Sequence, residues 1–284
     1  YSADNSQTAI QQLGDGQTLT ETFTVKAADG TTSSVTVTIN GTNDVAVISS
    51  SGTTGSVTED AGVSAGQIST GGTLSVSDTD AGQAGFQAQP GTNGAYGTFT
   101  LAADGTWTYS ADNSQTAIQQ LGDGQTLTET FTVKAADGTT SAVTVTINGT
   151  NDVAVISSSG TTGSVTEDAA VSGGQISTGG TLSVSDTDAG QAGFQAQPGT
   201  NGAYGTFTLA ADGTWTYTAN NSQAAIQQLG DGQTLTETFT VKAADGTTSS
   251  VTVTINGTND VAVISSSGTT GSVTEDASVS AGQI

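Results

Sequence analysis

The stretch VTVTINGTNDVAVI, residues 143–156, decides the organisation of this chain, and copies of it stand at 35–48 and 251–264. Apolar Val and Ile alternate with Thr in its first part, which is typical of a strand with one buried face. Asn-Gly then turns the chain, Asn and Asp follow in the open, and VAVI begins a second strand. The stretch therefore indicates a joint, where a strand leaves one β module and another enters the next.

Internal repetition extends this interpretation to the whole chain. The segment YSADNSQTAIQQLGDGQTLTETFTVKAADGTT begins at Tyr1 and again at Tyr109, and a near copy begins at Tyr217, a period of 108 residues. That period is the size of one small domain. We predict complete modules at 45–152 and 153–260, the final part of a module at 1–44, and the opening of another at 261–284. Neither end piece is expected to bury a core unless residues outside this sequence, or a neighbouring chain, complete it.

Within one module, alternation with a period of two recurs along several short segments. Each segment places its apolar residues on one face, and Thr fills most of the opposite faces, as on a solvated antiparallel sheet. Asp-Gly turns at 103–105 and 136–138 connect such segments, and only 114–121 has helical spacing. About seven strands in 108 residues predict an all-β fold of tandem immunoglobulin-like β-sandwiches. The predicted core includes Leu74, Val76, Phe99, Leu101, Trp107, Tyr109, Val143, Val145 and Ile147.

Composition excludes several classes of function. The chain has 26 acidic residues and three basic residues, all lysine, for a net charge of −23. This charge argues against nucleic acid and anionic membranes as partners and favours cations. Because Cys and His are absent, thiolate and imidazole metal sites and hydrolytic triads cannot form, and only hard, oxygen-ligated ions remain. No segment approaches the roughly 20 apolar residues of a membrane helix, so no membrane insertion is expected. We predict no enzymatic activity.

The strand directions sort most acidic residues to the two ends of each sandwich. At the linker 148–152 they bring together residues of the preceding module, the linker and the following module: Glu59, Asp60, Asp123, Asn148, Asn151, Asp152, Asp186, Asp188 and Asp245. Two like charges 4 Å apart repel by about 4 kcal/mol at an effective dielectric near 20. Calcium takes six to eight oxygen ligands and suits such a cluster, whereas magnesium prefers stricter geometry and keeps its waters. Glu167 and Asp168 repeat Glu59 and Asp60 ahead of the linker 256–260.

A resemblance to known families adds to this prediction. VKAADGTTSSVTVTINGTNDVAVI, residues 25–48, resembles the end of a cadherin-type module, with its AxDG turn, alternating final strand and Asn-Asp linker. The pattern GSVTED, GTLSVSDTDAG, YGTFTLAADGTWTY, LGDGQTLTETFTV and NGTND is similar to the VCBS repeats of very large bacterial surface proteins, over essentially the whole chain. The resemblance implies calcium at the joints, with the following ligands and their repeat copies: Asn43, Asp44, Glu59, Asp78, Asp80, Asp137, Asn151, Asp152, Glu167, Asp186, Asp188, Asp245, Asn259 and Asp260.

One element departs from the cadherin pattern. The LDRE motif of cadherins appears here only as LGDG, which contains Asp123 and, in the next copy, Asp231. Glu129 lies at an inward position of the following strand and is the alternative ligand.

The predicted function is structural. The chain is expected to be a row of extender modules in a secreted bacterial adhesin or surface fibre, located outside the cell and stiffened by calcium at each joint. Its partners would be neighbouring modules of the same or identical chains, with a surface or glycan ligand bound by domains outside this segment. Two alternatives stay open, namely a filament or matrix protein whose end pieces complete one another between chains, and a glycan-binding module.

Overall fold

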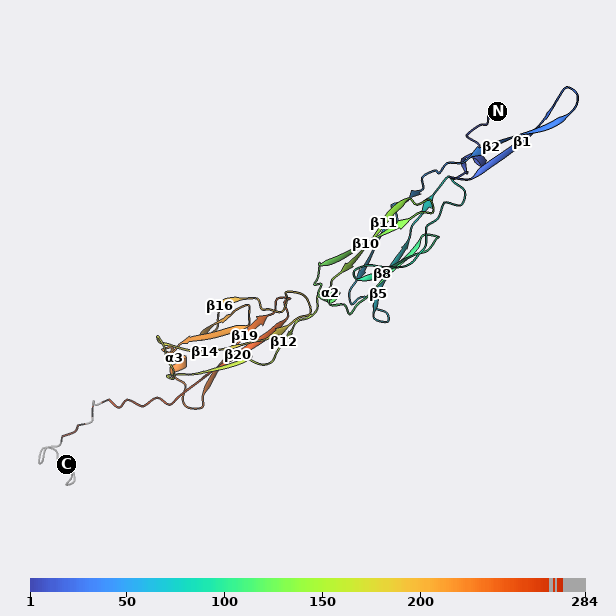
Figure 1. Ribbon diagram of the computed structural model, residues 1–284. Coiled ribbons are helices and arrows are strands. Elements are labelled where there is room, and N and C mark those ends of the chain that lie inside the picture. The colour runs from blue at the N-terminus through green and yellow to red at the C-terminus, as the bar shows by residue number, and fades with distance from the viewer. Residues whose placement is uncertain (266–267, 269, 273–284) are drawn as a thin grey trace. The chain divides into compact units, whose positions relative to one another are not determined.

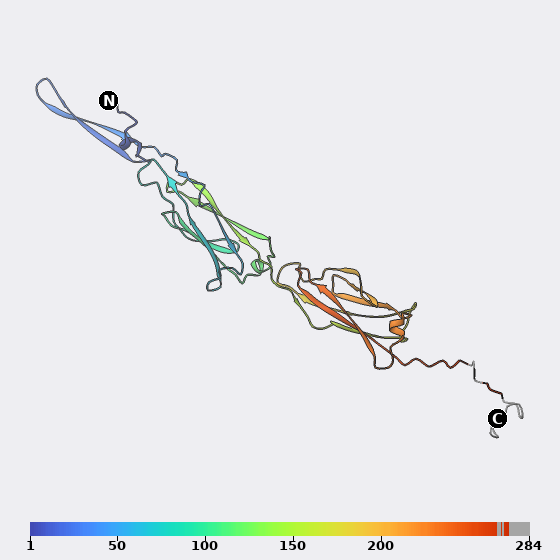
Figure 2. The same cartoon turned by 180° about the vertical axis from the view of Figure 1, so that it is seen from behind.

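The structure, a computed structural model, describes residues 1–265, 268 and 270–272. The chain forms two compact units (Figures 1 and 2). Unit 1 consists of Tyr1–Ala154 together with Asp186–Ala192, and unit 2 consists of Val155–Ser185 together with Gly193–Ile284. Each unit contains one complete sandwich of β-sheets, so the all-β prediction is confirmed.

The sandwich of unit 1 has a four-stranded and a three-stranded sheet. The first has the order β5-β9-β8-β7 and the second the order β10-β11-β4, and the short pair β3-β6 lies beside them. Strand β4 joins β11 in parallel, whereas all other pairs are antiparallel. The elements are β3 (Val47–Ile48), β4 (Thr54–Thr58), β5 (Gln67–Thr73), β6 (Val76–Ser77), β7 (Gln89–Asn93), β8 (Gly97–Leu101), β9 (Thr106–Asp112), α2 (Thr116–Gln119), β10 (Thr126–Lys134) and β11 (Thr140–Asn148).

The module therefore has nine strands where the sequence predicted about seven, because two runs of chain each form two strands instead of one. The first one pairs with β6 as β3 and then crosses to β11 as β4. The crossing passes through Gly52, whose φ of +75° is costly for other residues. A side chain there would also collide with the backbone oxygen of Thr73. The next run of chain, around Leu74, divides in the same way into β5 and β6.

Aromatic side chains fill the space between the two sheets. Phe99 stacks on Phe131 with 4.8 Å between ring centroids, and Trp107 lies 5.8 Å from Phe99. The indole nitrogen of Trp107 donates to the carbonyl oxygen of Gly52 at 2.9 Å, so its one polar atom is satisfied. All nine predicted core residues are buried except Val76, which is partly buried. Trp107 therefore packs in the core, as predicted, and offers no stacking surface to a ligand.

Unit 2 repeats this architecture. Its sheets have the orders β14-β18-β17-β16 and β13-β20-β19, with the short pair β12-β15. The elements are β12 (Val155–Ile156), β13 (Thr162–Thr166), β14 (Gln175–Thr181), β15 (Val184–Ser185), β16 (Gln197–Asn201), β17 (Gly205–Leu209), β18 (Thr214–Asn220), α3 (Ala224–Gln227), β19 (Thr234–Lys242) and β20 (Thr248–Asn256).

Residues 1–44 form only part of a sandwich. They contain α1 (Thr8–Gln11) and the hairpin of β1 (Thr18–Lys26) and β2 (Thr32–Asn40). None of the described residues forms a second sheet against this hairpin (Figures 1 and 2). Phe23 is 45% exposed, whereas its copy Phe131 is 4% exposed in the same local sequence.

The helices are single turns. The predicted helical segment 114–121 contains α2, which is four residues long and buries Ile118. In the described part of the chain, no helix is long and apolar enough to cross a membrane.

Candidate metal centre

Glu59 ties the linker 148–152 to the end of β4. Its side chain is 1% exposed, and its Oε1 accepts a hydrogen bond from the backbone nitrogen of Thr150 at 2.8 Å. The backbone nitrogen of Glu59 donates to the carbonyl oxygen of Asn148, and the Asn148 side chain donates to the carbonyl oxygen of Val57, both at 2.9 Å. The parallel pairing of β4 with β11 creates this contact, because both strands end at the same edge.

Asp186 and Asp188 approach the same linker from the following repeat. The backbone nitrogen of Asp188 donates to Asp186 Oδ1 at 2.9 Å, which forms a tight Asp-x-Asp turn. Asp188 Oδ2 accepts from the backbone nitrogen of Asp152 at 3.0 Å. Asn151 turns its side chain back onto the carbonyl oxygen of Asp152 at 2.8 Å. Since the segment 186–192 belongs to unit 1, these contacts lie within one compact unit.

The electrostatics of Glu59 reflect this gathering of carboxylates. Burial raises the pKa of Glu59 to about 6, and the N–H of Thr150 acts in the opposite direction. The negative charges of Asp60, Asp152 and Asp188 raise this pKa further. Carboxylates from three segments are therefore close enough to repel one another at the linker.

At the three linkers together, several carboxylate oxygens are buried and have no hydrogen-bond partner among the described residues. Such atoms are rare in folded proteins, because an uncompensated buried charge is costly. A hard cation would satisfy them, so the donor set fits calcium in chemistry and burial. In the described residues, however, no three carboxylate side chains stand at ligand spacing, so the cluster would have to close around an ion. The oxygens are Glu59 Oε2, Asp78 Oδ2, Asp80 Oδ1, Glu167 Oε2 and Asp186 Oδ2.

At the linker 40–44, the contacts with the following module are the same as those at the linker 148–152. The backbone nitrogen of Asp44 donates to Asp80 Oδ2 at 2.8 Å, and that of Asp80 donates to Asp78 Oδ1 at 2.8 Å. The Asn43 side chain donates to the carbonyl oxygen of Asp44 at 2.8 Å. Two linkers therefore place an Asp-x-Asp turn against the Asn-Asp segment with the same hydrogen bonds.

Asp137 anchors the first residues of the module. Its Oδ2 accepts from the backbone nitrogen of Ala46 at 3.0 Å and from the Thr139 hydroxyl at 2.6 Å. The hydrogen bond from Ala46, followed by those from Thr139, lowers the pKa of Asp137 to about 2. This carboxylate therefore stays ionised at neutral pH and lies next to the linker, as a ligand would. Its copy Asp245 accepts from the backbone nitrogen of Thr247 at 2.9 Å.

Asp60 has a role that the sequence did not indicate. Its φ is +57°, a conformation that few residues other than glycine adopt. Asn113 holds it there, since its Oδ1 accepts from the Asp60 backbone and its Nδ2 donates to Asp60 Oδ1 at 2.6 Å. Gln119 of α2 donates to the same oxygen at 3.0 Å. Asp60 therefore fastens the turn that follows Glu59, and Asp168 repeats this with Asn221 and Gln227.

The linker 256–260 lies in unit 2. Glu167 is fully buried, and its Oε1 accepts from the backbone nitrogen of Thr258 at 2.8 Å, as Glu59 does from Thr150. The Asn259 side chain donates to the carbonyl oxygen of Asp260 at 3.1 Å.

The remaining predicted ligands have other surroundings. Asp123 and its copy Asp231 lie on exposed turns. Glu129 is buried in the sandwich, where the hydroxyl of Tyr109 and the backbone nitrogen of Tyr96 donate to its two oxygens. Its inward position was correctly predicted, but its partners come from the core and not from the linker. Burial, followed by the hydrogen bond to Glu129, raises the pKa of Tyr109.

The raised pKa of Glu59 predicts a specific pH dependence of stability without calcium. The folded protein binds this proton near pH 6 and the unfolded chain near pH 4.5, so stability rises as pH falls through 6 and the gain is complete below about 4.5. At about 1.4 kcal/mol per pKa unit, the gain is at most about 2 kcal/mol. Thermal unfolding in chelator at pH 7.5 and 5.5 measures it.

Glu59→Gln is expected to abolish that rise. Asp137 acts in a separate window, because its lowered pKa means that its contribution is lost only as pH falls from about 4 toward 2. A wild-type chain that melts at lower temperature at pH 5.5 than at pH 7.5 would contradict the prediction.

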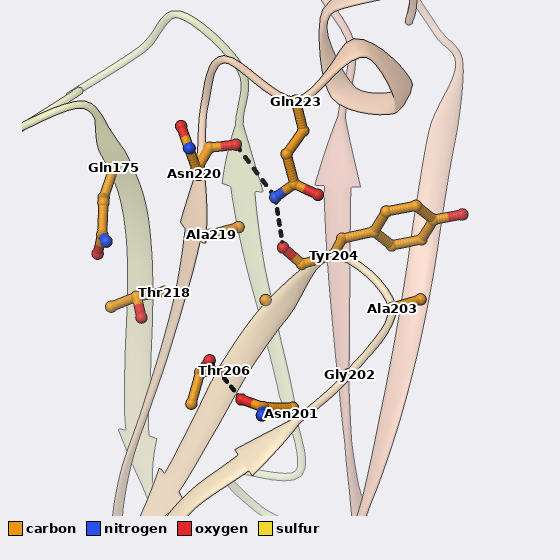
Figure 3. A pocket seen from close by; sticks show the side chains of 11 residues that line it. Gln175, Asn201, Gly202, Ala203, Tyr204, Thr206, Thr218, Ala219, Asn220 and Gln223 are labelled. Atoms are coloured by element: carbon orange, nitrogen blue, oxygen red, sulfur yellow. Dashed lines mark hydrogen bonds between the residues drawn. The ribbon is translucent and has the colours of Figure 1, made fainter.

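Unit 2 also carries a shallow pocket of about 290 Å³. The Gln223 amide donates to the carbonyl oxygens of Tyr204 and Asn220 at 2.6 and 3.2 Å, and the Thr206 hydroxyl donates to Asn201 at 3.0 Å. The ring of Tyr204 points away from the other labelled side chains (Figure 3). The pocket therefore presents mainly amides and hydroxyls, several of which are already hydrogen-bonded.

Comparison with known proteins identifies a family. Residues 43–149 and 151–257 each match the bacterial cadherin-like domain. Among solved structures, the chain is similar to the protocadherin GammaB4 extracellular domain, at 14% identity over 84% of this chain and 42% of that one, with a TM-score of 0.43. It is also similar to domains EC1-3 of mouse clustered PcdhgC3, at 12% identity over 87% of this chain and 79% of that one, with a TM-score of 0.40. No curated protein matches the chain.

Proposed function

We propose a structural extender role, on the premise that the chain belongs to the family of bacterial cadherin-like domains, of which it contains two tandem copies. In this role the chain is a segment of a secreted bacterial adhesin or surface fibre, and calcium bound at the linkers 40–44, 148–152 and 256–260 stiffens it. The proposal includes no catalytic step. Its partners are the neighbouring repeats.

The observation that carries this proposal is the pair of buried, unpartnered carboxylate oxygens, Glu59 Oε2 and Asp186 Oδ2, in unit 1. One follows β4 of the first complete repeat, and the other belongs to the first residue of the Asp-x-Asp turn of the second. A turn or a cap explains a carboxylate that accepts backbone hydrogen bonds, but it leaves these two buried oxygens unexplained.

The residues that would hold the ion at the linker 148–152 are Glu59, Asp152, Asp186 and Asp188. When bound, calcium supplies the positive charge that lets carboxylates of consecutive repeats stay together. Glu59 is fixed by Thr150, and Asp188 is fixed by Asp152, so the chain orients these groups before an ion arrives. A net charge of −23, with three lysines in the whole sequence, leaves few cationic side chains to do the same.

Small-angle scattering of the full chain tests the proposal. Extracellular calcium modules have dissociation constants of roughly 0.1–1 mM, so measurements are made in about 5 mM calcium and in excess chelator. We expect a larger radius of gyration and a longer maximum dimension in calcium, because linkers that bend more widely without the ion shorten the mean length of the chain. Equal dimensions in both conditions would overturn the proposal.

One observation favours a second candidate, a self-assembling filament. The hairpin β1-β2 has an apolar face that includes Phe23, Val25 and Val35, and none of the described residues forms a second sheet over it, so these side chains are 45–48% exposed. A second chain could cover it by adding strands. Concentration-dependent growth of light scattering supports this candidate, and a constant monomer mass counts against it.

A further inference from the structure

Two hydrogen bonds join loops of consecutive repeats without any carboxylate or metal. The backbone nitrogen of Ala81 donates to the carbonyl oxygen of Gln12 at 3.0 Å, and that of Ala189 donates to the carbonyl oxygen of Gln120 at 3.1 Å. The donors belong to the loop DAGQ, at 80–83 and 188–191, and the acceptors lie just after α1 and α2. All four residues are in unit 1.

A glutamine side chain packs beside each of these bonds. Gln191 Nε2 donates to Asp188 Oδ2 at 3.0 Å, and Gln83 Nε2 donates to Asp80 Oδ2 at 3.2 Å. The same amide lies against the glycine of the preceding LGDG turn. A Cβ at Gly122 would come within 2.5 Å of Gln191 Nε2, and one at Gly14 would collide with Gln83 in the same way.

The third copy of the turn provides a contrast within the chain. Gly230 occupies the same position in the sequence LGDG, yet a Cβ there meets only Gln233 Oε1, at 3.7 Å. Gly14 and Gly122 are buried, whereas Gly230 is partly exposed. The crowding at Gly14 and Gly122 therefore comes from the loop of the following repeat and not from the turn itself.

We propose that the loop 188–191 docks on the turn 121–122, and the loop 80–83 on the turn 13–14, as a contact between repeats that requires no calcium. This inference deepens the proposed function and rests on it only in treating the linkers as stiffened by calcium. The backbone bond and the glutamine amide restrict bending between the two repeats when the ion is absent, and calcium restricts it further. Because Asp80 and Asp188 accept from the glutamines, the docked loop also places those carboxylates at the linker.

Ala189→Pro tests the backbone bond directly, because proline has no N–H to donate to Gln120. The chain lacks cysteine, so Ala102→Cys and Ala210→Cys place one spin label on an exposed turn of each complete repeat. Pulsed electron resonance then measures the distribution of distances between the labels in the full chain. In chelator, we expect Ala189→Pro to broaden this distribution at least twofold relative to the unsubstituted chain, and in calcium we expect both to be narrow.

Gly122→Val is the second variant, because it displaces Gln191 without altering the backbone donor. Its matched control is Gly230→Val, in the same local sequence, where a Cβ meets only Gln233 among the described residues, and this control is expected to leave the distribution unchanged. If the unsubstituted chain in chelator is already as broad as Ala189→Pro, or if neither variant broadens it, the proposal is overturned. The docking contact is tested only by comparing the variants in chelator. If calcium narrows none of these distributions, that result would instead contradict the proposed function.

Discussion

Replacing Glu59 by glutamine is expected to lower the calcium affinity of the linker 148–152 by about 10–100-fold. The substitution keeps the shape of the side chain and its bond from Thr150, but it removes one charge from a buried position. Two unit charges 4 Å apart interact by about 4 kcal/mol at an effective dielectric of 20. Losing roughly half of that, about 2 kcal/mol, corresponds to about 30-fold. Calorimetric titration of the full chain at pH 7.5 measures the effect as the loss of one class of sites.

Two further variants make this result specific. Asp186→Asn removes a charge from the other side of the linker and is expected to act in the same direction. Asp104→Asn is the control, because Asp104 is exposed on a hairpin turn and accepts from the Thr106 backbone within that turn, away from the linkers. If Glu59→Gln binds calcium as tightly as the unsubstituted chain, Glu59 is no ligand. If Asp104→Asn weakens calcium binding equally, the loss of affinity comes from the lower net charge of the chain and not from the loss of a ligand.

The fold was predictable from sequence because its strands follow a simple rule. Phe99, Trp107 and Val145 stand at alternate positions of short Thr-rich segments, and all three are buried. The strand directions also placed Glu59 and Asp188 at the linker 148–152. There the backbone of Thr150 donates to Glu59, and that of Asp152 donates to Asp188. The topology was enough to predict this placement, because consecutive antiparallel strands put each connecting loop at one defined end of the sandwich.

What the sequence did not reveal depends on tertiary partners. Alternation placed Glu129 on the inward face but could not tell that Tyr109 would donate to it, since the partner comes from the other sheet. The docking of Gln191 over Gly122 was also missed, because Asp-Ala-Gly-Gln reads as an ordinary turn. The Asn113 bond to Asp60 joins residues 53 positions apart with no pattern linking them. The module limits 45–152 and 153–260 remain a prediction.

Replacing Phe131 by alanine is expected to destabilise unit 1 by about 3–5 kcal/mol, whereas Phe23→Ala costs less than about 1 kcal/mol. Both residues occupy the same position of the sequence TLTETFTVK. Phe131 stacks on Phe99 and is 4% exposed, but Phe23 is 45% exposed and touches only the ring of Tyr1 among the aromatic residues described. Denaturant unfolding followed by tryptophan fluorescence measures the difference, because Trp107 lies in the affected core.

The comparison also distinguishes the two candidate functions. Phe239→Ala, in unit 2, is expected to lower stability by as much as Phe131→Ala, because the ring of Phe239 stacks on Phe207 with the same 4.8 Å between centroids. This variant therefore measures the cost of removing the side chain from a complete sandwich. If the face of β1-β2 is exposed in solution, alanine at Phe23 leaves no cavity and stability stays nearly constant. If Phe23→Ala costs as much as Phe131→Ala at high protein concentration but not at low, a second chain must cover that face, and the filament would then be favoured over the extender.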